Sequence, residues 1–251
     1  MDIDGVLTVS WVAIPGAVEA LQRLRDASVP VVLVTNTTSI GRAAVATRLR
    51  DAGFAVDDDE ILTAPVMTAS YLRREHADER VAVVGEGDVT ADLDGVRVVD
   101  LADDPDVVVL AGGGPALDYA TLNRLFQLVV DGTPLVAMHR NLSWTTDQGL
   151  QLDSGAFLVG IEQAAHVRAV TVGKPSPECF AAGLELLGRT AAETTMVGDD
   201  LDADVLGAQA VGIHGVLVRT GKFRPEALEH AGTQPDEVVD SFADVPTLLG
   251  V

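Results

Sequence analysis

Short apolar runs alternate with segments of helical periodicity along this chain, and this alternation is the feature that most restricts its fold. Val29–Val34 and Glu60–Thr63 are predicted strands, and helical spacing marks Pro15–Asp26, Ile40–Ala52 and Val66–His76. Strand–helix–strand order requires crossover connections, which build a parallel sheet covered by helices. The predicted fold class is therefore α/β, with a Rossmann-like parallel sheet flanked by helices.

The pattern restarts near Ala77 and resumes its first form near Val170. Between these points we expect strands, helices and one loop or hairpin: Val81–Val84, Val96–Val99, Val107–Leu110 and Leu135–His139 as strands, Asp118–Val130 and Gly155–His166 as helices, and Arg140–Asp153 as the loop or hairpin. After Val170 a helix runs through Leu187, and strands follow at Thr195–Val197 and Gly215–Val218. The expected organisation is a core formed by residues 1–77 and 168–251, with a smaller α/β domain inserted at 78–167.

The composition limits the kind of protein this can be. Hydrophobic residues make up 47% of the 251 residues and aromatics only 4%, so Val, Leu, Ile and Ala must form the core. No apolar run reaches the length of a membrane span. The single cysteine, Cys179, excludes an internal disulfide and fits a reducing cytosol, so we expect a cytoplasmic protein without a membrane partner.

The formal net charge of −21 argues against nucleic acid or an anionic membrane as a partner. The same charge repels a phosphorylated substrate. A phosphate-binding site would therefore need its own positive charge, from a metal ion, a lysine or helix N-termini.

The chain opens with two carboxylates, Asp2 and Asp4, directly before Gly5. Alternate residues of a strand share a face, so both can reach one site where the chain turns. Two carboxylates that reach one site repel each other unless a cation or a shared proton lies between them. The pair therefore suggests a metal-assisted acid/base site. Such a pair alone is also common on acidic surfaces. Asp2 follows Met1 directly, which leaves the strand almost no residues on its amino side, and we expect an upstream start or a trimmed chain.

Four polar clusters follow predicted strands: Asp2 with Asp4, Thr35-Asn36-Thr37, Lys174, and Asp199 with Asp200 and Asp204. Any one of them could be a helix cap. Ligands of open parallel sheets bind at the carboxyl ends of the strands, and four complementary clusters there favour one shared site. A calcium-loop interpretation of the last cluster fails, because the positions that need Gly and Glu hold Val205 and Val211.

Four segments, DIDGVLT, TNTTS, VGKPSP and VGDDLDADVLGA, resemble in order the four motifs of haloacid dehalogenase-like phosphohydrolases. The insertion between the second and third segments resembles the C2-type cap of the NagD-like branch, subfamily IIA. Within that branch, TNTT and HRNLSWTTDQGLQLDSGAF look most similar to phospholysine phosphohistidine inorganic pyrophosphate phosphatase-like and related hydrolase-domain-containing proteins.

The resemblance implies an Mg²⁺-dependent phosphatase that acts on a small phosphorylated metabolite. Asp2 would attack phosphorus to give an aspartyl-phosphate, and Asp4 would act as general acid and base. Asp2, the backbone carbonyl of Asp4 and Asp199 would hold Mg²⁺. Asp200 and Asp204 would orient metal-bound waters.

The same resemblance assigns the substrate contacts. Thr35, with the amides of Asn36 and Thr37, would bind the phosphoryl oxygens, and Lys174 would neutralise charge on both nucleophile and phosphate. The inserted domain would act as a cap that selects the substrate and forms a homodimer. Its candidate contacts to the leaving group lie in the polar loop: His139, Arg140, Asn141 and Trp144.

Two alternatives remain. A carbon–halogen hydrolase of the haloacid dehalogenase type has the same fold, but its chemistry needs neither an acid at the Asp4 position nor metal-binding aspartates. A catalytically silent or substrate-binding protein would keep the fold without turnover, although all the polar residues required for turnover are present.

Overall fold

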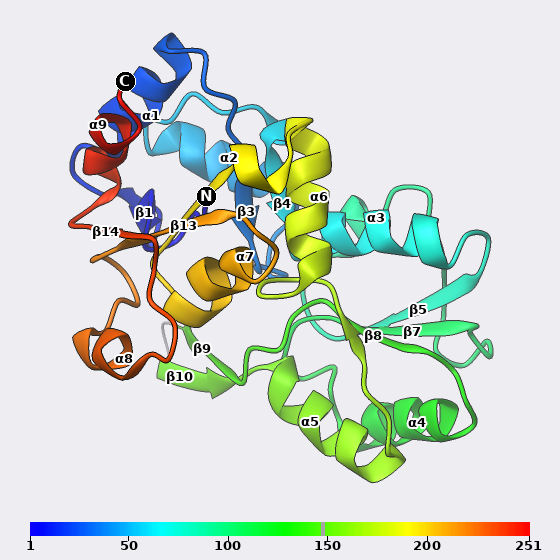
Figure 1. Ribbon diagram of the computed structural model, residues 1–251. Coiled ribbons are helices and arrows are strands. Elements are labelled where there is room, and N and C mark those ends of the chain that lie inside the picture. Colours follow the sequence, from blue (N-terminus) through cyan, green and yellow to red (C-terminus); the bar gives the residue numbers. More distant parts are fainter. Residues whose placement is uncertain (147–148) are drawn as a thin grey trace. The chain divides into compact units, whose positions relative to one another are not determined.

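The computed structural model describes residues 1–146 and 149–251. The chain divides into two compact units (Figure 1). The first unit comprises Met1–Thr35, Arg42–Leu62 and Lys174–Val251, and the second comprises Asn36–Gly41 and Thr63–Gly173.

These boundaries lie at 62/63 and 173/174, whereas the sequence pattern places them at 77/78 and 167/168. Helix α3 (Ala64–Glu75) belongs to the second unit, because Arg73 donates a hydrogen bond to the backbone oxygen of Asp94 there. Strand β11 (Val170–Thr171) also belongs to it, because β11 pairs in parallel with β8 (Leu135–Ala137). Contacts between segments distant in the sequence, which no local pattern specifies, thus accompany both limits.

The sheet of the first unit consists of two strand groups with the start of the chain between them. Strands β12 (Thr195–Gly198), β13 (His214–Val218) and β14 (Glu237–Val239) are parallel neighbours, and β3 (Leu33–Thr35) pairs with β4 (Ile61–Thr63). The Asp2 amide donates to the Val197 oxygen at 2.9 Å, and the Val34 amide donates to the Met1 oxygen at 2.8 Å. The first residues therefore lie between β12 and β3, in the middle of the sheet.

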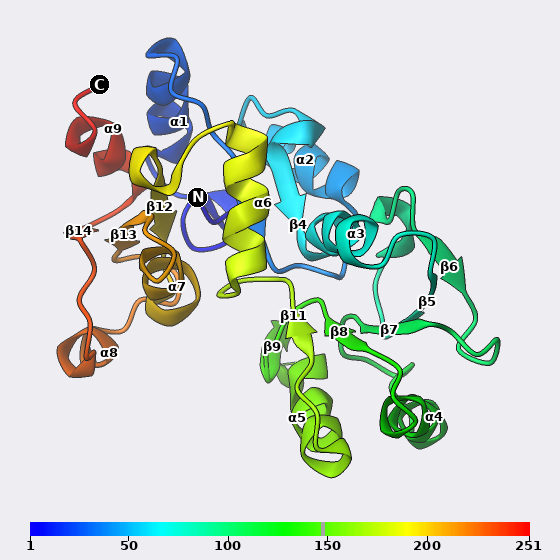
Figure 2. The same cartoon turned by 45° about the vertical axis from the view of Figure 1, so that its right-hand side comes forward.

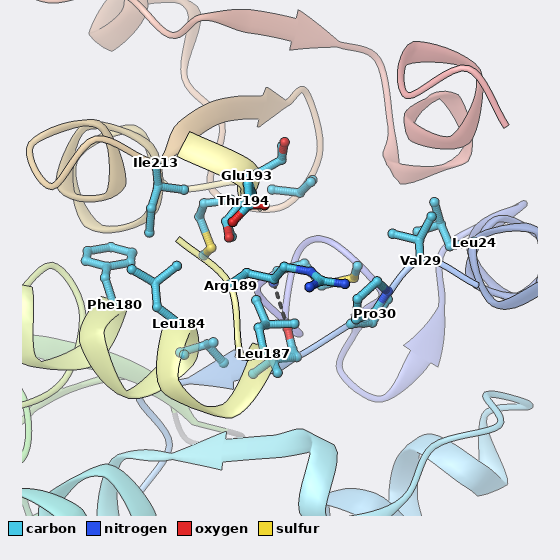
Figure 3. A pocket seen from close by; sticks show the side chains of 18 of the residues that line it. Leu24, Val29, Pro30, Phe180, Leu184, Leu187, Arg189, Glu193, Thr194 and Ile213 are labelled. Carbon is cyan, nitrogen blue, oxygen red and sulfur yellow. Dashed lines mark hydrogen bonds between the residues drawn. The ribbon is translucent and has the colours of Figure 1, made fainter. Parts of the chain in front are cut away.

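The strand expected over these first residues is reduced to isolated bridges, in which Asp2 pairs in parallel with Val34 and Asp4 with Thr8. The Met1 ammonium donates to the Val32 oxygen at 2.8 Å, and its burial lowers its pKa to about 6. Next to Met1 lies an apolar cavity of about 330 Å³, and Figure 3 shows Val29 and Pro30 on one side of it, Thr194 on another and helix α6 beside them. The residues that precede Val32 and Val197 in the two neighbouring segments thus line the cavity next to Met1. A small hairpin, β1 (Thr8–Val9) and β2 (Val12–Ala13), follows these first residues.

The helices of the first unit form where apolar residues recur every three or four positions. Helix α1 (Ala17–Asp26) buries Ala17, Ala20, Leu21 and Leu24 in this way, and α6 (Pro177–Leu187) starts at a Ser176 cap and ends at Gly188 in the left-handed conformation. Phe180 of α6 packs with Met196 of β12 and Ala208 of α7 (Gly207–Gln209) in one core cluster. The remaining helices are α2 (Arg42–Asp51), α8 (Pro225–His230) and α9 (Val245–Leu248).

The second unit is built on a parallel sheet in the order β11-β8-β7-β5-β6, where β5 is Arg80–Val84, β6 is Arg97–Val99 and β7 is Val107–Leu110. Helices α4 (Tyr119–Val130) and α5 (Ser154–Ala165) cover one face and α3 the other (Figures 1 and 2). Apolar residues of the sheet and of both covering helices share one core: Val108, Leu110, Leu125, Leu128 and Leu158. The predicted α/β class, with parallel sheets and flanking helices, is confirmed.

The segment Arg140–Asp153 forms an antiparallel hairpin of β9 (Ser143–Thr146) and β10 (Gly149–Leu152), one of the two expected forms. Asp147 and Gln148, which belong to the same predicted segment, lie outside the described residues. None of the helices in the described part of the chain is long and apolar enough to cross a membrane.

Candidate active site

Four charged side chains from separate segments converge where the central strands of the first unit end. The carboxylates of Asp2, Asp199 and Asp204 are buried and each offers an oxygen within 4.8 Å of the others. The Lys174 ammonium, also buried, lies 2.6 Å from Asp2 Oδ1 and 2.7 Å from Asp204 Oδ1. Three carboxylates and one ammonium thus share a single buried volume.

Two glycines allow these side chains to approach. Gly5 has a φ of +84°, and a Cβ there would overlap the Asp199 carboxylate. A Cβ on Gly198 would likewise overlap the side chain of Asp204. The turn after Asp4 and the end of β12 therefore need residues without side chains.

Burial and mutual repulsion set the protonation of the group. Burial alone would lower the pKa of Lys174, but the neighbouring Asp2 and Asp204 outweigh it and raise this pKa, so the lysine is an ammonium. Burial, followed by the charge of Asp2, raises the pKa of Asp199 to about 7. Burial raises the pKa of Asp204 to about 6, against the opposing effect of Lys174. One ammonium does not neutralise three carboxylates, so the cluster favours bound protons or a further cation.

The Asp199 carboxylate provides the test of whether a metal fits. Its Oδ2 accepts a hydrogen bond from the Lys222 amide at 2.6 Å. Its Oδ1 is buried and has no hydrogen-bond partner within the part of the chain that the structure describes. An orphaned carboxylate oxygen beside Asp2 is a suitable ligand for a hard divalent cation, so the residues present fit a metal ion.

Asp4 stands apart from this buried group. It is exposed, and its carboxylate is not among the three that lie within 4.8 Å of one another. Partial desolvation, and next the charge of Asp2, raise the pKa of Asp4. A carboxyl with a raised pKa at the edge of a buried charge cluster is suited to give and take a proton.

Asp200 is engaged locally. Its Oδ1 accepts from the Ala203 amide at 3.0 Å and so caps the π-helical segment η4 (Leu201–Leu206). The expected role of Asp200 in orienting metal-bound waters stays a prediction.

A loop that the motif analysis did not single out also contacts the cluster. It follows β13 and comprises Thr220, Gly221 and Lys222. The Thr220 hydroxyl donates to the Gly5 oxygen, and a Cβ on Gly221 would overlap both Asp199 and Gly5. The available signal was the same as for the other clusters, a polar segment directly after an apolar strand.

Comparisons with known proteins give matches over most of the chain. A family model described as haloacid dehalogenase-like hydrolase matches residues 1–98, and a second, described as HAD-hydrolase-like, matches residues 171–245. The human haloacid dehalogenase-like hydrolase domain-containing protein 2 is 36% identical over 242 residues, which cover 96% of this chain and 91% of the relative. The chain belongs to the haloacid dehalogenase-like hydrolase family.

Other members of the family resemble the chain over nearly its whole length. The mouse phospholysine phosphohistidine inorganic pyrophosphate phosphatase is 34% identical over 255 residues, covering 99% of this chain and 92% of the relative. The structure of p-nitrophenyl phosphatase from Archaeoglobus fulgidus superposes with a TM-score of 0.91 at 29% identity, covering 98% of this chain and 97% of that chain. NagD from E. coli K-12 superposes with a TM-score of 0.87 at 31% identity, covering 97% and 95%. The NagD-like resemblance is confirmed, and these enzymes are named as phosphatases or as NagD.

The family's second motif spans both units. Thr35 ends β3, one residue beyond the Val34 that bridges to Asp2. Asn36 and Thr37 belong to the second unit, where the Thr37 hydroxyl lies 3.2 Å from that of Ser39. The contribution of all three residues to phosphate binding stays a prediction.

Two of the four residues predicted to contact the leaving group already interact with carboxylates of the second unit. His139 is buried, with its Nε2 3.8 Å from Asp153, and burial lowers its pKa. The Arg140 guanidinium forms a two-nitrogen pair with Glu162, at 2.8 and 2.6 Å. Asn141 and Trp144 are exposed and are the members of this set that remain accessible.

Proposed function

We propose that this chain is an Mg²⁺-dependent phosphatase that hydrolyses a small phosphorylated metabolite through an aspartyl-phosphate on Asp2. The observation that carries the proposal is the buried carboxylate of Asp2, held by Lys174 at 2.6 Å within a group of acidic oxygens that fits a divalent cation. The relatives named as phosphatases support the same reaction class.

Asp2 is suited to nucleophilic attack because a carboxylate oxygen can attack phosphorus and form a covalent intermediate. One oxygen of Asp2 forms a bond to phosphorus while the bond from phosphorus to the leaving oxygen breaks. Lys174, in contact with the nucleophile, holds that carboxylate in position and opposes its repulsion by the phosphate.

Asp4 acts as the general acid and then as the general base. It donates one to the leaving oxygen as the aspartyl-phosphate forms, and it then accepts one from the water that attacks this intermediate. Its raised pKa increases the fraction of the protonated form that the first step requires.

The metal would be held by the side chain of Asp2, the backbone carbonyl of Asp4 and the side chain of Asp199. Asp200 and Asp204 would orient the waters of the metal. When bound, Mg²⁺ supplies positive charge that stabilises the transferred phosphoryl group. Thr35, Asn36 and Thr37 would bind the other phosphoryl oxygens. The second unit would act as the cap that selects the substrate, with dimerisation through it a further prediction.

An assay with p-nitrophenyl phosphate tests the proposal. Hydrolysis is expected with MgCl₂, and EDTA should abolish it reversibly. Hydrolysis that survives EDTA would contradict the metal requirement. Chloride release from a chloroalkanoate without phosphatase activity would favour the dehalogenase alternative, and no turnover of either substrate would favour a silent binding protein.

A further inference from the structure

Three consecutive residues of the loop after β13 contact Gly5, in the turn after Asp4, or the side chain of Asp199. Thr220 donates its hydroxyl to the Gly5 oxygen, Gly221 packs directly on Gly5 and Asp199, and the Lys222 amide donates to Asp199 Oδ2 at 2.6 Å. The backbone of Lys222 therefore has a fixed position beside the acidic cluster. Its side chain, 63% exposed, is free to move from that fixed point.

The Lys222 ammonium differs from that of Lys174 in what surrounds it. Lys174 is buried and bonded to two carboxylates at 2.6 and 2.7 Å. The described contacts give Lys222 one long ion pair, with Nζ 3.9 Å from Asp200 Oδ2. An exposed pair of this length contributes little stability, so the ammonium can leave Asp200 for another anion.

The two lysines also contact different carboxylates. Lys174 contacts Asp2, the proposed nucleophile. Lys222 follows Gly221, which packs on Gly5, the residue after Asp4, so this lysine extends from the loop that contacts the turn carrying the residue that would protonate the leaving oxygen.

We propose that Lys222 is a specificity-determining residue, whose ammonium binds an anionic group carried on the leaving group of the substrate. The inference rests on the proposed phosphatase function. Without this cation, the carboxylates of Asp4 and Asp200 would repel a second negative charge on the leaving group, and the net charge of −21 would add to the repulsion. The preferred substrates are therefore phosphate compounds with a second acidic group in the part that leaves.

Phenyl phosphate and 4-carboxyphenyl phosphate provide a matched test, because they differ by one carboxylate on the leaving group. In Lys222→Met, kcat/KM for 4-carboxyphenyl phosphate should fall about tenfold, whereas kcat/KM for phenyl phosphate should change less than about twofold. Lys222→Arg should retain the wild-type ratio, because it keeps the charge.

Arg219→Met is the control variant. Arg219 lies in the same stretch and pairs with Asp240 at 2.8 Å, so its removal deletes one positive charge away from the cluster. The substrate ratio should stay unchanged in this variant. An equal loss for both substrates in Lys222→Met, or a ratio that does not respond to residue 222, would overturn the inference while leaving the phosphatase function intact. Failure of the unaltered protein to hydrolyse either ester with Mg²⁺ would overturn the proposed function itself.

Discussion

Asp2 and Asp4 are two residues apart, yet the structure gives them different environments. Asp2 is buried against Lys174, whereas Asp4 is exposed and outside the group of three carboxylates. One position favours a nucleophile that is held in place, and the other favours a group that exchanges protons. At the scale of single residues, these environments make separable predictions.

Asp2→Asn should lower kcat for p-nitrophenyl phosphate by at least about 10³-fold, because an amide cannot form the acyl phosphate. Mass spectrometry of the acid-quenched wild-type protein should show one added phosphoryl group on the peptide that contains Asp2, and the variant should lack it. Turnover close to that of the wild type would refute the assignment of the nucleophile.

Asp4→Asn should slow turnover by about 10²–10⁴-fold while Mg²⁺ binding persists, because the proposed ligand at this position is the backbone oxygen. Titration calorimetry with MgCl₂ measures the second part of this prediction. Loss of metal binding in Asp4→Asn would show that the side chain, and not the carbonyl, holds the ion.

At the scale of secondary-structure elements, helix α6 borders the apolar cavity. Gly183 lies within α6 and lines this cavity, and a Cβ there would meet no atom within 4 Å. Gly183→Ala should therefore raise the free energy of unfolding by up to about 1 kcal/mol from helix propensity, and any gain beyond that of an exposed helical glycine would come from the cavity.

Gly160→Ala is the matched control for this substitution. Gly160 lies inside α5, is exposed, and also has open space around its Cβ position. Urea denaturation should show a gain of up to about 1 kcal/mol from helix propensity in this variant. Equal gains in the two variants would mean that the cavity contributes nothing.

The ion pair between Arg140 and Glu162 joins the segment after β8 to helix α5. Glu162 is 7% exposed and also accepts from the Ala169 amide at 2.9 Å. Arg140→Met should destabilise the fold by about 1–3 kcal/mol, because it leaves a buried carboxylate with the Ala169 amide and the more exposed Arg168 as its remaining partners.

Arg168→Met serves as the comparison in urea denaturation, since Arg168 is 75% exposed and its pair with Glu162 is longer, at 3.2 Å. Its loss should cost at most about 0.5 kcal/mol. The double variant Arg140→Met with Glu162→Gln should recover part of the loss. If the double variant is no more stable than Arg140→Met, the uncompensated charge of Glu162 is not the cause of the destabilisation.

At the scale of the whole molecule, the acidic cluster links stability to pH. Burial raises the folded-state pKa of Asp199 to about 7 and of Asp204 to about 6, above the ordinary value of 3.8. Between about pH 4 and 6 the folded protein therefore binds more protons than the unfolded chain, and the free energy of unfolding falls as the pH rises.

For the metal-free protein, we expect a loss on the order of 2 kcal/mol between about pH 4.5 and 6. Above about pH 6 the Met1 amino group, whose pKa is lowered, contributes with the opposite sign. Urea denaturation at each pH measures the slope, and Asp199→Asn should flatten it. Because Mg²⁺ displaces the same protons, it should raise Tm more at pH 8 than at pH 5.

Much of the fold follows from local sequence. Helix α1 lies where apolar residues recur every three to four positions. Strand β7 lies at an unbroken apolar run of three valines and a leucine. Asp2, Lys174 and Asp199 were predicted to converge because parallel strands end at one edge, and the structure places them together. The hairpin of β1 and β2 and strand β14 were not predicted, because these short strands include exposed residues and form no buried apolar run.

The sequence by itself determined the α/β class, the family and the acidic residues at the strand ends, because periodicity and motif spacing are local properties. Only the tertiary structure decided that β11 joins the sheet of the second unit, that Asp199 keeps one buried oxygen without a partner, and that Lys222 is anchored beside it. These features depend on which distant backbone groups meet, and spacing along the chain does not carry that information.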